Sequence, residues 1–447
     1  MYKIFDTLEQ YNQFTDNGTN LTSGVTYYVK EDSSSHFQTN NIDGEEKVYD
    51  MLGDVFIKNI SENEEIQPNM TYKDIRYFLK NINIPNGVTS IAQVTFQKCY
   101  CLTSVNIPDS VTEMGNAVFN KCSNLKRVKL GNGLTYIGEG WFNKCSNLTE
   151  INIPQGVTKV ERLSFGECSS LTDIVFSDNL KTIGINAFQL CSNLKNVILG
   201  NGLTSIGYGA FTHCSSLTSI NIPNSVTSID EGAFNQCTGL TSITIPDSVT
   251  TIGESAFGAC SNLTSVTIGS GVTSIGDFAF CWCPGLTSIV VDSANTVYDS
   301  RDNCNALINK STNELIAGCK NTVIPNTVTS IGVNAFNQCT GLTSITIPDS
   351  VTNISRAAFF DCSGLTSVTI GSGVTSIGQN AFNGCTGLTS VTIEATNPPT
   401  LSSDAFNNNA TGRKIYVPDE SVETYKTSTN WSQYATDIKP LSEYIEE

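Results

Sequence analysis

The stretch Leu240-Thr-Ser-Ile-Thr-Ile-Pro-Asp-Ser-Val-Thr-Thr-Ile-Gly-Glu-Ser-Ala-Phe-Gly-Ala-Cys260 decides the fold, because it predicts one complete structural unit. In its first half Ile243 and Ile245 alternate with Ser242 and Thr244, which predicts a strand with the isoleucines facing inward. The proline that follows ends the strand, since it has no N–H to donate. In the second half, two apolar residues keep a strand-compatible spacing, and the Ala-Phe-x-x-Cys spacing is typical of a single helical turn. The unit is therefore predicted as mostly β with one short helical corner.

The same unit recurs with a period of 23 residues, in the pattern C-x-x-L-T-S-[IV]-x-[ILV]-[PG]-x-x-[VL]-T-x-I-G-x-x-A-F. The period is carried by a ladder of cysteines: Cys99, Cys122, Cys145, Cys168, Cys191, Cys214, Cys237, Cys260 and Cys283, resuming at Cys339, Cys362 and Cys385. It is carried equally by the phenylalanines from Phe96 to Phe406, which predict about 13 coils. One coil alone cannot bury its apolar side chains, so neighbouring coils are expected to stack into a solenoid with one continuous core.

The chain is predicted to divide into three parts. Residues 1–80 carry no repeat and hold 14 Asp/Glu against 7 Lys/Arg, which indicates an N-terminal cap or attachment domain with a strand at 25–30. The solenoid is expected over 81–410. Residues 411–447 are predicted to form a C-terminal cap in which Tyr425 and Trp431 cover the open apolar face of the last coil, as solenoid ends require.

An insertion interrupts the solenoid between Cys283 and Cys339, at residues 292–324. Within it, the segments 305–310 and 314–319 flank Ser-Thr-Asn, a pattern that predicts a β-hairpin. We expect this hairpin to project from one edge without breaking the stack.

Charge and hydropathy exclude several classes of function. The formal net charge is −17 and the pI is about 4.5, and no run of Lys/Arg is long enough to neutralise phosphates, so no nucleic-acid partner is predicted. No stretch approaches the about 18 apolar residues of a membrane span. The N-terminal residues lack the charged and apolar regions of a classical signal peptide.

The cysteine ladder is predicted to be a column of small, buried, reduced thiols, because free cysteine behaves as a compact hydrophobe. Structural zinc sites use paired Cys-x-x-Cys or Cys/His spacings that the ladder lacks, so no metal site is predicted. Whether Cys304 and Cys319, in the insertion, are bonded to each other is left open by the sequence.

The sequence offers no constellation for catalysis. It has only two histidines, His36 and His213, and the position of His213 before the ladder cysteine is held by Lys, Glu, Leu, Gln, Ala or Trp in other coils. We therefore predict that the protein is not an enzyme, with no catalytic residue and no cofactor.

What remains is a surface of outward-facing strand residues. These vary in the early coils, where a basic group stands out in an acidic protein, whereas later coils repeat Ser and Thr. The basic group is expected either to dock an acidic partner or to be a solvated face, and the Ser/Thr rows either to bind a ligand or to be soluble filler. The candidate binding residues are Lys126, Arg127, Lys129, Glu150, Asp173, Lys195, Ser242 and Thr244.

The repeat unit resembles the BspA-like leucine-rich repeat, also called the TpLRR type, over roughly residues 82–410. The resemblance implies a curved β-lined solenoid, and it implies that the protein binds host matrix proteins or other cells from a surface. A second resemblance, of Asn20-Leu-Thr-Ser-Gly-Val-Thr-Tyr-Tyr-Val-Lys-Glu-Asp32 to opening segments of tail or fibre proteins of gut bacteriophages, covers few residues.

Two functions follow as hypotheses. The first is a non-catalytic binding or adhesion scaffold that presents its repeat surface and the insertion to a protein or glycan on a host cell. The alternative is a tail or fibre protein of a bacteriophage virion, attached to other virion proteins through residues 1–80. Either hypothesis places the protein in extracellular surface display, as a cell-surface protein or as a virion component.

Overall fold

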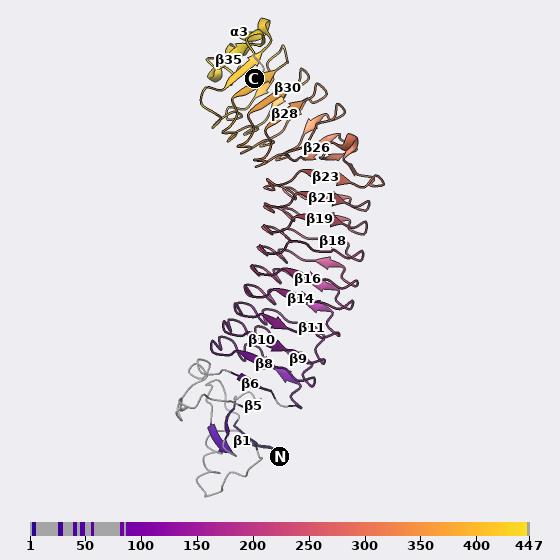
Figure 1. Ribbon diagram of the computed structural model, residues 1–447, viewed down its shortest axis with the longest axis vertical. Helices are drawn as coiled ribbons and strands as arrows, with labels where there is room; N and C mark the ends of the chain where they lie inside the picture. Colours follow the sequence, from indigo (N-terminus) through magenta and orange to yellow (C-terminus); the bar gives the residue numbers. More distant parts are fainter. Residues whose placement is uncertain are drawn as a thin grey trace. The chain divides into compact units, whose positions relative to one another are not determined.

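The computed structural model describes five short strands near the N-terminus and then residues 81–84 and 86–444 (Figure 1). The described residues fall into two compact units, Met1–Ser215 and Ser216–Glu447. In each unit the chain winds through successive coils, and equivalent strands of neighbouring coils pair in parallel 23 residues apart, as Arg127 does with Ser104 and with Glu150. The predicted β-rich solenoid is therefore confirmed.

The first unit has two strand rows. The front sheet, made by the first strand of each coil, contains β6 (Asn81–Asn83), β8 (Ser104–Asn106), β10 (Arg127–Lys129), β12 (Glu150–Ile151), β14 (Asp173–Val175) and β16 (Asn196–Ile198). The side row, made by the second strand of each coil, contains β7 (Ser90–Ile91), β9 (Glu113–Met114), β11 (Tyr136–Ile137), β13 (Lys159–Val160), β15 (Thr182–Ile183) and β17 (Ser205–Ile206).

The N-terminal strands of this unit follow a different arrangement. β1 (Tyr2–Phe5) pairs in parallel with β2 (Thr26–Val29), and β2 lies where the sequence predicts a strand. β3 (Thr39–Ile42), β4 (Glu45–Tyr49) and β5 (Val55–Ile57) form an antiparallel meander, and β5 pairs with β6. The front sheet is thus extended by a meander at its N-terminal edge.

The second unit has two strand rows of the same kind. Its front strands are β19 (Ser242–Ile245), β21 (Ser265–Ile268), β23 (Ser288–Val291), β28 (Ser344–Ile347), β30 (Ser367–Ile370), β32 (Ser390–Ile393), β34 (Lys414–Val417) and β35 (Ile438–Pro440). Its side strands are β18 (Ser228–Ile229), β20 (Thr251–Ile252), β22 (Ser274–Ile275), β27 (Ser330–Ile331), β29 (Asn353–Ile354), β31 (Ser376–Ile377) and β33 (Thr400–Leu401).

The core consists of columns of identical side chains. The rings of Phe234 and Phe257 lie parallel with their centroids 5.2 Å apart, and those of Phe165 and Phe188 are 5.0 Å apart. The ladder cysteines form a second column, in which nine of the thiols donate to the carbonyl of a phenylalanine in the preceding coil, as Cys168 does to Phe142 at 3.1 Å. Like side chains therefore contact like side chains along the stack.

Threonine hydroxyls hold the coils together on the surface. Thr264 Oγ1 donates to the Thr241 carbonyl at 2.9 Å, and Thr241 Oγ1 donates to the Thr218 carbonyl at 3.2 Å. A second row does the same, as Thr250 does to Thr227 at 3.1 Å. These threonines, which the sequence leaves as filler or as ligand-binding groups, have a structural role.

The predicted helical corner is wrong in detail. Each corner is a pair of tight turns, seen in the bonds from Asn120 N to Ala117 O and from Cys122 N to Phe119 O. Two residues per corner have left-handed backbone angles, for example Ala117 (φ 57°) and Lys121 (φ 65°). This conformation turns alternate N–H groups of the corner toward the next coil, where Phe119 N donates to Trp141 O at 2.9 Å, and a helix would keep those groups for itself.

The insertion forms β24 (Tyr298–Asp299), a short 3-10 turn η1 (Arg301–Asn303), β25 (Leu307–Asn309) and β26 (Glu314–Ala317), and β25 pairs antiparallel with β26. This hairpin does not project from the stack. β26 pairs in parallel with β27, and Leu307, Ile308 and Leu315 are buried. Burial of these apolar side chains keeps the hairpin in the side row, where it takes the place of a repeat coil.

The C-terminal segment closes the second unit. After β34 come η2 (Asp419–Ser421), α3 (Val422–Thr427), η3 (Ser432–Tyr434), β35 and η4 (Leu441–Glu443). Tyr425 and Trp431 are buried, and the indole ring of Trp431 lies 6.1 Å from the ring of Phe406 in the last coil. Its Nε1 donates to the Pro399 carbonyl at 2.8 Å. The segment therefore covers the apolar surface of the last coil and also provides a hydrogen-bond donor for one of its backbone carbonyls.

Candidate binding site

The front sheet of the first unit is interrupted between β12 and β14. β10 pairs with β12 and β14 pairs with β16, but within the described part of the chain no backbone hydrogen bond joins residues 149–153 to residues 172–176. The same two coils remain stacked elsewhere, through β13 and β15 and through the bond from Phe165 N to Ala187 O at 2.8 Å. The coils therefore separate on the front face only.

The side chain of Asn152 ends β12 early. Its Oδ1 accepts the Leu130 N–H at 2.8 Å, and its Nδ2 donates to the Leu130 carbonyl at 2.9 Å. The amide group thus takes the place that the backbone of the next strand residue occupies in other coils. On the far side of the interruption, Phe176 packs edge-on against Phe188 with centroids 6.1 Å apart, so this ring belongs to the next coil.

A hollow of about 830 Å³ lies at the interruption, lined by residues of β8, β10, β12 and β14 and of the segments that follow them. Its floor is apolar. Ile151 and Ile153 are only half-buried, although the equivalent residues one coil earlier, Val128 and Leu130, are buried. The missing pairing therefore exposes part of the core.

The rim of the hollow is charged on both sides. Arg127 and Lys129 stand on β10 and Glu150 on β12, all three exposed, and in the described part of the chain none of them has an ion pair or a side-chain hydrogen bond. Asp173, on β14, accepts hydrogen bonds from the Asn196 amide and the Thr172 hydroxyl, which hold the pKa of its carboxyl below the ordinary value. A basic pair and two carboxylates therefore face solvent in three successive coils.

The structure gathers half of the predicted binding residues in this hollow: Arg127, Lys129, Glu150 and Asp173. Lys126 and Lys195 are exposed just before β10 and β16 but do not line it. Ser242 and Thr244 lie on β19 in the second unit. Sequence reasoning missed Asn152, Ile151 and Ile153, because this coil matches some of its sisters, such as those in which Asn106 follows Val105 and Asn221 follows Ile220.

The ladder thiols are not suited to chemistry. Burial raises the pKa of Cys191 to about 12 and raises that of Cys145 further, so both remain protonated at neutral pH. Cys304 and Cys319 are free thiols that donate to the carbonyls of Ala306 and Asn305. Within residues 81–84 and 86–444 no group of three or more His, Cys, Asp or Glu is arranged to hold a metal ion.

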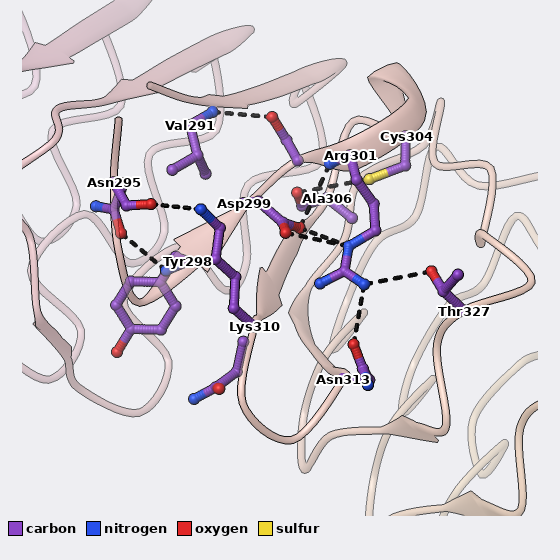
Figure 2. Close-up of polar contacts among 12 residues, drawn as sticks. Val291, Asn295, Tyr298, Asp299, Arg301, Cys304, Ala306, Lys310, Asn313 and Thr327 are labelled. Carbon is purple, nitrogen blue, oxygen red and sulfur yellow. Dashed lines mark hydrogen bonds and ion pairs between the residues drawn. The ribbon is translucent and has the colours of Figure 1, made fainter. Parts of the chain in front are cut away.

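The polar residues of the insertion bind one another (Figure 2). Arg301 Nε contacts both carboxylate oxygens of Asp299, at 2.9 and 3.1 Å, and its Nη1 donates to Asn313 Oδ1 at 2.9 Å. Asn295 accepts the Tyr298 N–H at 2.8 Å, and the Lys310 ammonium donates to the Asn295 carbonyl. Asn295 Nδ2 also donates to the carbonyls of Gly269 and Val272 in the preceding coil, at 3.0 and 2.9 Å, which fixes the insertion to the stack.

A 23-residue coil with a buried leucine, a parallel strand and stacked neighbours defines a leucine-rich-repeat solenoid. The family model described as "BspA type Leucine rich repeat region (6 copies)" matches residues 64–195, 181–307 and 308–434. The chain belongs to this BspA-type leucine-rich-repeat family. Proteins of the family are generally not catalytic and are typically associated with surfaces.

The chain is similar to solved structures, and the first of the following two shows the same fold. A leucine-rich repeat protein from Bacteroides ovatus is 24% identical, with a TM-score of 0.53 over 86% of this chain and 98% of that one. A leucine rich cell surface protein from Faecalibacterium prausnitzii is 27% identical, with a TM-score of 0.48 over 90% of this chain and 94% of that one. No curated protein matches the sequence. Among the described residues, no helix has the length and apolar character to cross a membrane.

Proposed function

We propose that this protein is a non-catalytic adhesion scaffold, which presents the front sheet of its first unit to a protein or glycan on the surface of a host cell. The observation that carries the proposal is the hollow between β12 and β14, where exposed core residues lie beside charged groups without partners. Apolar surface rimmed by polar groups is typical of interaction sites. The insertion, whose Asp299, Arg301 and Lys310 are engaged by neighbouring polar groups, has a structural role in this proposal.

The distribution of charge supports the choice of the first unit. Residues 81–215 hold 10 Lys/Arg and 8 Asp/Glu, a net charge of +2, whereas residues 216–447 hold 8 and 20, a net charge of −12. With residues 1–80 included, the first unit holds 17 Lys/Arg and 22 Asp/Glu, a net charge of −5, so a partner with acidic groups would be attracted only locally, by the basic residues of β10.

The test is binding of the labelled full chain to intact mammalian epithelial cells and to immobilised extracellular-matrix proteins. The double variant Arg127→Glu/Lys129→Glu is expected to weaken binding at least tenfold, since it reverses two unpaired charges at the rim. Lys159→Glu is the matched control, because Lys159 is an exposed lysine on β13 of the side row. The absence of saturable binding to any of these surfaces, or equal loss in the control, would contradict the proposal.

The alternative, a bacteriophage tail or fibre protein, has no support from the family match or from the two structures. Its resemblance rests on residues 20–32, of which only β2 lies within the described residues. Detection of the chain by proteomics in purified phage particles would establish it.

A further inference from the structure

The interruption of the front sheet leaves two strand edges facing each other, and neither has a strand partner on its gap side among the described residues. In the sister coils, Glu150 N donates to Lys126 O and Asn196 N donates to Thr172 O, each at 3.1 Å. The equivalent bond, from Asp173 N to Thr149 O, is missing within the described part of the chain, together with the rest of that ladder. An unpaired strand edge is a template on which another chain can form a strand.

We propose that the gap between β12 and β14 is a strand-acceptor site, into which a partner protein inserts an extended segment that pairs with both edges. This inference rests on the proposed binding function and names the partner class. Because all other pairs in the front sheet from β6 to β16 are parallel, an inserted strand continues the sheet in the same direction. Main-chain hydrogen bonds then supply affinity, and alternate side chains supply specificity.

The side chains around the gap define the sequence of the segment. Two residues of the segment would point toward the core. One would lie between Ile151 and Ile174 and the other between Ile153 and Phe176, so both positions require apolar side chains. Toward solvent, one residue would lie between Glu150 and Asp173, two carboxylates on opposite edges. A lysine or arginine at that position would pair with both carboxylates.

The outer neighbours of the gap restrict the register. The next outward residue of the segment would lie between Asn152 and Val175, which suits threonine because its methyl and hydroxyl groups match the two sides. Arg127 and Lys129 stand one strand beyond Glu150, where they disfavour further basic residues in the partner. The segment that fits is therefore Thr-Lys-apolar-Thr-apolar, with the single basic residue second.

The probe is the acetylated and amidated peptide Leu-Thr-Lys-Val-Thr-Ile carrying a fluorophore, titrated with the full chain in an anisotropy assay. We expect saturable binding that the double variant Glu150→Gln/Asp173→Asn weakens about tenfold or more. Glu113→Gln, an exposed carboxylate of the side row on β9, is the control and leaves the affinity unchanged. Peptides with Glu in place of Lys, or with an N-methyl group on the valine nitrogen, are expected to lose binding, since the first reverses the charge and the second removes a ladder donor.

Amide hydrogen exchange locates the bound peptide. Addition of the peptide is expected to slow exchange in residues 149–153 and 172–176 and to leave β15 unchanged. Saturable binding of the peptide without slower exchange in these segments would overturn the strand-acceptor site. Unchanged affinity for the N-methyl peptide would overturn it as well, even if adhesion to cells depends on Arg127 and Lys129. If the peptide binds and protects these segments but the chain adheres to no cell or matrix surface, the proposed function fails and the strand-acceptor site stands.

Discussion

Replacement of Phe165 by alanine is expected to destabilise the first unit strongly. Its ring is fully buried and stacks on Phe142 at 5.5 Å and on Phe188 at 5.0 Å. Truncation of a buried phenylalanine costs about 3–5 kcal/mol, of which the two stacked contacts contribute roughly 0.5–1.5 kcal/mol each. Because a solenoid's stability is a sum over neighbouring coils, the loss falls mainly on the coils of Phe142, Phe165 and Phe188.

The assay is urea unfolding of the full chain, followed by circular dichroism and by hydrogen exchange resolved along the sequence. Ile185→Ala is the matched control, since Ile185 lies in the next coil, three residues before Phe188, and is 46% exposed. We expect the control to change the free energy of unfolding by no more than about 0.5 kcal/mol. Equal unfolding midpoints for Phe165→Ala and Ile185→Ala would refute the stacked column.

Three further predictions concern other contacts. The pKa of about 12 for Cys191 exceeds the ordinary thiol value of 9.0, so the native state keeps a proton that the unfolded chain loses. For this thiol alone, the stabilising contribution is complete below pH 9 and falls between pH 9 and 12, by up to about 1.4 kcal/mol per pH unit. Because burial also raises the pKa of Cys145, Cys168 and Cys283, Cys191→Ala removes only one thiol's share of the dependence of the urea midpoint on pH. Thr264→Val removes the hydroxyl bond to Thr241 but leaves that carbonyl its backbone donor, so a loss of only about 0.5–1 kcal/mol is expected by urea unfolding. Trp431→Ala uncovers Phe406 and is expected to cost about 3–5 kcal/mol and to make the last coils the first site of limited proteolysis, whereas cleavage elsewhere first would contradict a capping role.

The repeat made the stack predictable from the sequence. Equal spacing of Phe and Cys fixes which side chains meet, because a coil that cannot bury its own residues must place them against the same residues of its neighbour. The corner was predicted less well, since Ala-Phe-x-x-Cys has helical spacing while the observed backbone needs left-handed residues such as Lys121 and His213. That conformation is imposed by hydrogen bonds to the next coil, which local spacing does not encode.

The candidate site was predictable only in part. Variation of charge at outward positions indicated Arg127, Lys129, Glu150 and Asp173, because the repeat pattern shows which positions face out. Beside the gap, Asn152 bonds back to Leu130 in the preceding coil, and Asn106 stands at the same position two coils before Asn152. The sequence does not distinguish these two asparagines, because they differ only in whether their strand pairs with the strand of the following coil.

The most direct test of the interrupted stack is amide hydrogen exchange of the free protein, measured residue by residue by NMR. The account predicts fast exchange at Ile151 and Ile153, whose N–H groups face the gap, and slow exchange at Val128 and Leu130, which lie at the same positions in the paired coil before them. Equal protection at all four amides would show a closed ladder and contradict the gap on which the binding site depends.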